Sequence, residues 1–162
     1  MSTFCIYLEL EPYLKQWFVN DLGGGVPVSL PRGSAESDII EKWLMKRPLN
    51  ACPDIARPNL LPVFLPSFKS KDVRTYNYLP AAAHKLLRNC IRNRFLVEMW
   101  KDLHDFGYIG IRKQDVIMAW MEQHNIECDD TNFNTVAKIY QRKRDVYRNN
   151  LYRKKIRDIR FK

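Results

Sequence analysis

Hydrophobic and polar positions alternate in two different ways along the chain, and the change falls near residue 80. Before it, short apolar runs are separated by turns, and all nine prolines lie at or before Pro80. After it, apolar residues repeat at three- and four-residue steps without a single proline. This pattern predicts an α+β fold, in which a small N-terminal strand-and-helix part is followed by a mainly helical, helix-turn-helix-like C-terminal part.

The first part is expected to begin with a strand, because "TFCIYLEL" is rich in β-branched and aromatic residues. A helix should run from Pro12 to the glycines at 23–25, and a second helix from Ser34, the expected N-cap, to Pro48. The buried side of this second helix is expected to carry four apolar residues: Ile39, Ile40, Trp43 and Leu44.

Two six-residue segments, "VPVSLP" at 26–31 and "LPVFLP" at 61–66, resemble each other. They could belong to a degenerate strand–helix repeat. They could equally be two unrelated strands whose prolines are confined to edges or ends, because proline cannot donate a hydrogen bond to a sheet.

Three helices are expected in the second part. The first begins after Pro80 and ends near Gly107, a suitable C′ residue, and the second lies within 112–125. A turn, "IECDDT", precedes the third helix, with Asp129 and Asp130 as its capping and dipole partners. The apolar sides are expected to carry Val116, Ile117, Trp120 and Met121 on the second helix, and Phe133, Val136, Ala137, Tyr140 and Tyr147 on the third.

The last two helices and the turn between them have the general layout of a helix-turn-helix module. We therefore expect three parts: 1–79, a small α+β part that could serve dimerisation; 80–150, a three-helix, helix-turn-helix-like part; and 151–162, a basic tail.

A polar stripe on the third helix is the candidate surface for contact with bases, and consists of Thr131, Asn134, Thr135, Lys138 and Arg142. Asparagine suits adenine, arginine suits guanine, and threonine suits phosphate or a thymine methyl group. The basic residues that follow are expected to contact phosphates: Lys143, Arg144, Arg148, Arg153, Lys154 and Lys155. The simpler interpretation is the solvated outer face of an ordinary amphipathic helix.

Charge favours the nucleic-acid interpretation. The net charge is +9, and residues 138–162 hold eleven lysines and arginines against only Asp145 and Asp158. A concentrated positive field attracts polyanions through counterion release. Nucleic acid is thus the expected partner, with DNA favoured over RNA, and further contacts could come from "SFKSKDVR" at 67–74 or from Lys85, Arg88 and Arg92.

Two alternatives remain open. One is an interaction or assembly module whose basic end binds an acidic protein. The other is an RNA-binding protein in which Tyr140, Tyr147 or Tyr152 stacks on unpaired bases. Small size, basic charge and a helix-turn-helix-like end resemble, in general character, accessory proteins of bacterial mobile elements and phages, which would imply a regulatory or accessory role.

The expected protein is not an enzyme and needs no cofactor or metal. No phosphate-binding loop GxxxxGK[ST], no GxSxG and no HExxH is present. The three histidines stand twenty residues apart, and the four cysteines form no CxxC pair, so we expect reduced thiols and a cytoplasmic location. No export signal and no membrane-spanning run is recognised in the sequence.

Overall fold

A computed structural model describes residues 4–52, 55–104, 110 and 112–160, with the backbone alone for 156–160. The described residues form five helices and two small antiparallel sheets, so the α+β prediction is confirmed. The chain divides into two compact units, residues 1–95 and 96–162. The division falls inside helix α3 (Ala81–Leu103), whereas composition suggested a division near residue 80.

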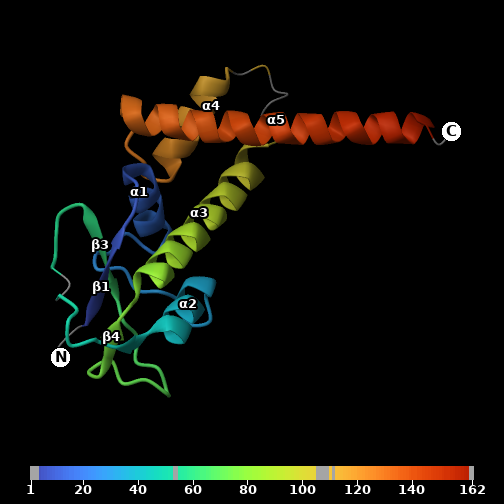
Figure 1. Cartoon of the computed structure of the whole chain (residues 1–162). Helices are drawn as coiled ribbons and strands as arrows, with labels where there is room; N and C mark the ends of the chain where they lie inside the picture. Colours follow the sequence, from blue (N-terminus) through green and yellow to red (C-terminus); the bar gives the residue numbers. More distant parts are fainter. Residues whose placement is uncertain (1–3, 53–54, 105–109, 111, 161–162) are drawn as a thin grey trace. The chain divides into compact units, whose positions relative to one another are not determined.

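The N-terminal unit is built around strand β1 (Cys5–Glu9), which pairs antiparallel with β3 (Leu60–Phe64). On the other edge of β3, Val28 forms a parallel bridge with Val63, so that the two similar hexapeptides of the sequence are neighbours (Figure 1). The backbone N–H of Val28 donates to the Pro62 carbonyl at 3.0 Å, and the Phe64 N–H donates to the Val28 carbonyl at 2.9 Å. A second sheet pairs β2 (Met45–Lys46) with β4 (Tyr76–Tyr78).

Helices α1 (Pro12–Asp21), α2 (Ala35–Trp43) and the first turns of α3 complete the core of this unit. The rings of Trp17 and Phe95 meet edge to face, with centroids 5.3 Å apart. The predicted cap is present, because Ser34 accepts a hydrogen bond from the Ser37 N–H at 3.2 Å. Trp43 was expected to be buried, but 38% of it is exposed, since it is the last residue of α2 and turns outward there.

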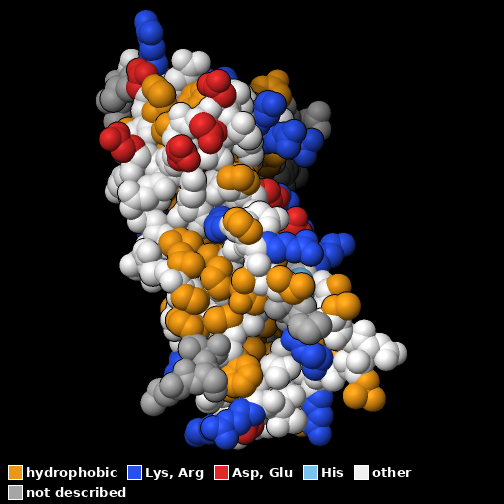
Figure 2. Space-filling view, turned by 90° about the vertical axis from the view of Figure 1, so that its left-hand side faces the viewer, with side chains coloured by type: hydrophobic (Ala, Val, Ile, Leu, Met, Phe, Trp, Pro, Cys, Tyr) orange, Lys and Arg blue, Asp and Glu red, His pale blue; other side chains and the backbone are white. Residues whose placement is uncertain are grey.

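Both faces of the β1–β3 pair are apolar. Ile6, Leu8, Leu61 and Val63 lie on the buried face. The opposite face carries Cys5 and Tyr7 from β1 and Leu60, Pro62 and Phe64 from β3, all half-buried. Apolar side chains also gather over the lower half of the view in Figure 2. Since a sheet with one solvated face usually alternates apolar with polar residues, this second apolar face is unusual.

The C-terminal unit holds the end of α3, then α4 (Lys113–Gln123) and α5 (Asp130–Arg160). As predicted, Ile117, Trp120 and Met121 of α4 are buried. Val136 and Tyr140 supply the buried side of α5. The expected end of the long helix at Gly107 lies outside the described residues. No described helix combines the length and hydrophobicity needed to cross a membrane.

A capping arrangement fixes the start of α5. The Asp129 carboxylate accepts from the backbone N–H of Asn132 at 2.6 Å, so Asp129 acts as the predicted cap. Asn132 itself is buried, and its side-chain amide donates to the Glu127 carbonyl at 3.0 Å. These bonds satisfy polar groups of the turn and set the direction in which α5 leaves it.

Candidate nucleic-acid interface

Helix α5 is long enough to carry two functional segments. Its 31 residues correspond to about 46 Å at the usual rise of about 1.5 Å per residue. The first part, up to Tyr140, has a buried side that packs in the C-terminal unit. From Gln141 to Lys155 every residue except Arg144 is exposed, so this segment offers nearly its whole circumference to solvent.

The predicted polar stripe lies on the solvent side of α5. Thr131, Asn134, Lys138 and Arg142 are exposed. Thr135 is only half-buried, and its hydroxyl donates to the Thr131 carbonyl at 2.8 Å. That bond occupies its hydroxyl hydrogen, so Thr135 is the member of the stripe least free to donate to a ligand.

The predicted phosphate-contacting residues are also at the surface, with one exception. Those that are exposed are Lys143, Arg148, Arg153, Lys154 and Lys155. Arg144 is half-buried, and its Nη1 has no hydrogen-bond acceptor among the described residues although it is shielded from solvent. Arg144 lies on the inner side of the helix, between Tyr140 and Tyr147, and is therefore a weaker candidate for contact with phosphate.

The positive charges of α5 are not neutralised by nearby carboxylates of the described part of the chain, where no ion pair involves them. Asp145 is the one acidic residue in the segment 138–155, and it accepts a hydrogen bond from Gln141 at 2.9 Å. The helix therefore presents a largely uncompensated positive field to solvent.

Basic residues of the N-terminal unit are used differently. Arg88 pairs with Glu9 at 3.6 Å, and Arg92 pairs with Glu11. In the 67–74 loop, Lys71 donates to the carbonyls of α2 and its end, at 2.8 Å to Leu44 and 3.2 Å to Lys42. The two additional groups suggested by the sequence thus spend several of their cations on internal contacts, whereas Lys69, Arg74 and Lys85 are exposed.

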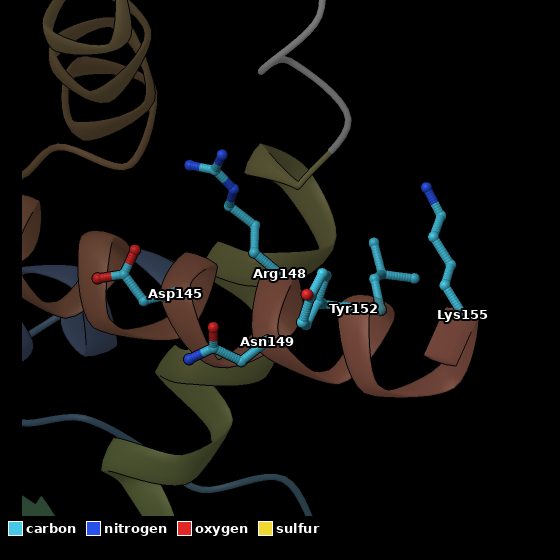
Figure 3. Close-up of a pocket in the computed structure, with 6 residues that line it drawn as sticks. Asp145, Arg148, Asn149, Tyr152 and Lys155 are labelled. Carbon is cyan, nitrogen blue, oxygen red and sulfur yellow. The ribbon is translucent and has the colours of Figure 1, made fainter. Parts of the chain in front are cut away.

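The three tyrosines of α5 differ in exposure. Tyr140 is buried, with its ring centroid 6.3 Å from that of Trp100, as its place on the apolar side predicted. Tyr147 lies 5.4 Å from Trp100 but remains 40% exposed. Tyr152 is 68% exposed and projects from α5 beside Arg148, one turn before Lys155, as Figure 3 shows. Only Tyr152 is therefore free to stack with its whole ring on a ligand.

One cluster gave no sequence signal because its members come from different helices. The indole N–H of Trp120 donates to the Asp102 carboxylate at 2.9 Å, and His124 Nε2 lies 3.5 Å from the same oxygen. The Trp120 and His124 rings are 4.4 Å apart. Within the described residues, no group of three or more His, Cys, Asp or Glu side chains is placed to hold a metal ion.

The four cysteines are free thiols. Burial raises the pKa of Cys5, and burial together with Glu36 raises that of Cys90. Burial, then Glu122 and Asp129, raise the pKa of Cys128. Because the thiolate is the reactive form, these three thiols are less nucleophilic at neutral pH than an ordinary cysteine.

Comparison with protein-family models, with curated proteins and with solved structures found no match to this chain. A function therefore has to be inferred from the side chains of the chain itself and from their charges.

Proposed function

We propose that this protein is a non-enzymatic nucleic-acid-binding protein that binds duplex DNA through α4, the turn after it and α5. One observation carries the proposal: among the described residues, the basic side chains of α5 are exposed and take part in no ion pair, whereas Arg88, Arg92 and Arg94 are all paired with carboxylates. Uncompensated positive charge concentrated on one exposed helix favours a polyanionic partner.

The two segments of α5 would have different roles. Asn134, Lys138 and Arg142 lie on its exposed side near the turn, where a recognition helix contacts base edges in the major groove. The segment from Lys143 to Lys155 carries charge around its circumference, which suits phosphates and positions the protein without selecting sequence. Such a protein would act as a regulator or as an accessory factor of a mobile element or phage.

The salt dependence of binding tests the proposal. Affinity for a labelled random duplex is measured by fluorescence anisotropy over a range of salt concentrations. If about five phosphates are contacted, the log–log slope should be on the order of −4 or steeper. A flat salt response, or no binding at low salt, excludes duplex binding. Lys69→Ala, which removes an exposed cation from the N-terminal unit, is the matched control and should leave the slope unchanged.

Single-stranded RNA is the second candidate, and the exposure of Tyr152 favours it. An aromatic ring that is 68% exposed between Arg148 and Lys155 has the composition of a stacking platform for unpaired bases. Duplex DNA and single-stranded RNA of equal length are compared at one salt concentration. Tighter binding of the single strand, with a loss in Tyr152→Ala but not in Arg142→Ala, would favour the RNA alternative. An acidic protein as partner is supported if neither nucleic acid binds.

A homodimer through the N-terminal unit is a further part of the proposal. The half-buried apolar face formed by Cys5, Tyr7, Leu60, Pro62 and Phe64 supports it, because an isologous interface buries the same surface of both copies. Light scattering should give twice the monomer mass for the natural chain and the monomer mass for Tyr7→Lys. A monomer in both cases removes the dimer from the proposal.

A further inference from the structure

The C-terminal unit contains a pocket of about 400 Å³ between the end of α3 and one side of α4. Four side chains give it apolar walls: Leu103, Val116, Ala119 and Trp120. Leu103 and Trp120 also belong to the core of this unit, so these two walls are held by packing. The volume lies within the range of about 300–1,000 Å³ that is typical of small-molecule sites.

Two carboxylates, from Asp102 and Asp115, also line this pocket. Among the described residues no lysine or arginine forms an ion pair with either of them. Asp102 is 42% exposed and accepts the Trp120 indole N–H, and Asp115 is an exposed residue of the first turn of α4. The pocket is thus locally acidic although the chain carries a net charge of +9.

From this combination we infer that the pocket binds a small hydrophobic amine. The ammonium group would lie between the Asp102 and Asp115 carboxylates, where its charge is compensated. The apolar body would lie against Leu103, Val116 and the Trp120 ring and lose its contact with water. A neutral molecule gains only the second contribution, and an anion of the same shape is repelled by the two carboxylates.

This inference does not depend on nucleic-acid binding. The pocket is lined by acidic and apolar residues, whereas the proposed DNA surface is the basic, exposed side of α5. A polyanion and a hydrophobic amine would therefore contact different side chains, so either inference can fail while the other stands.

The test compares two probes that share an indole ring and differ in charge: tryptamine, which is a cation, and 3-indolepropionate, which is an anion. The Trp120 indole N–H signal in ¹H–¹⁵N spectra of the ¹⁵N-labelled chain is the reporter, because its acceptor is Asp102 itself. Tryptamine should shift this signal and bind at least about tenfold more tightly than 3-indolepropionate, given two carboxylates near its ammonium group. Equal affinities, or shifts confined to residues elsewhere, overturn the inference.

Variants identify the pocket residues. Asp115→Asn should weaken tryptamine binding about threefold or more, because it removes one of the two carboxylates. Ala119→Phe should abolish binding by filling the pocket, and should leave the α-helical circular dichroism unchanged. Glu122→Gln removes an exposed carboxylate of the same helix that does not line the pocket, and should leave binding unchanged. If Ala119→Phe fails to fold, the Asp115→Asn and Glu122→Gln pair still decides: equal effects of the two contradict the site.

Discussion

The guanidinium of Arg94 in α3 lies 3.2 Å from the carboxylate of Glu36 in α2, although only 2% of the Glu36 side chain is exposed. The same guanidinium pairs with Asp21 and lies 5.6 Å from the centre of the Trp17 ring. A buried carboxylate is tolerated because a cation and its hydrogen bonds compensate for lost hydration. Arg94 therefore joins α1, α2 and α3 inside the N-terminal unit.

Arg94→Met should destabilise the protein more than any other single loss of an ion pair in this unit. It leaves the Glu36 carboxylate buried without its cation, and we expect the free energy of unfolding to fall by about 3 kcal/mol, at the low end of the range for a buried pair because Arg94 is itself partly exposed. The measurement is urea unfolding followed by tryptophan fluorescence. Arg88→Met is the control, since Arg88 and Glu9 are both exposed and their pair should contribute under about 1 kcal/mol. Equal losses in the two variants would contradict the role given to Arg94.

Lys71 is expected to stabilise the end of α2. Its ammonium group donates to the carbonyls of Glu41, Lys42 and Leu44, which belong to the last turn of that helix and the residue after it. Lys71→Met removes these charge-assisted bonds and the favourable interaction with the helix dipole, and should lower the free energy of unfolding by about 1–2 kcal/mol. Lys69→Met, two residues away and exposed, should change it by less than about 0.5 kcal/mol. Denaturant unfolding of both variants side by side checks the difference.

Local patterns allowed several parts of the fold to be predicted. The caps Ser34 and Asp129 follow from short sequences that fix the backbone over three or four residues. The helical period likewise indicated the buried sides of α4 and α5. Exposure at helix ends was harder to predict, as Trp43 shows, because it depends on which element arrives from elsewhere in the chain.

The pairing of Val28 with Val63 illustrates what the sequence could not provide. The likeness of the two hexapeptides was visible, and the two valines occupy equivalent positions in them. Nothing in either segment says that its neighbour in the sheet is the other, since pairing of distant segments depends on the packing of both against a shared core. The parallel bridge is a fact of tertiary structure, and it leaves open whether the segments arose by repetition.

The same distinction applies to the candidate interface. The outward direction of Lys138 and Arg142 followed from the apolar residues opposite them. Whether carboxylates compensate the charges depends on neighbours in space, and for this reason similar basic spacing gave paired arginines on α3 but exposed, unpaired cations among the described residues of α5. The half-buried position of Arg144 was not predicted, because its inner neighbours come from the packing of α5 on Trp100.

Arg142→Ala and Lys138→Ala should each weaken duplex binding while leaving the protein as stable as before. Both side chains are exposed, so their removal leaves no cavity and no unpaired carboxylate in the described structure. A lost base contact is expected to cost about 1–3 kcal/mol and to relax sequence preference at one position. Anisotropy titrations give the affinity, and thermal unfolding of the same samples gives the stability. A variant that loses binding only because it unfolds would show that the side chain is structural.

Truncation after Asn150 should reduce general affinity more than sequence preference. The removed residues 151–162 hold six lysines and arginines and one aspartate, so the loss is mainly of charge. Because phosphate contacts are shared by specific and random sites, both affinities should fall together and the salt slope should become shallower by up to about five. A full-length chain with those six residues changed to glutamine separates charge from length, and should behave like the truncated chain. If the truncated chain binds as tightly as the full chain, the terminal turns of α5 have no part in binding; if only the glutamine variant does so, their contribution comes from apolar contacts instead of phosphate neutralisation.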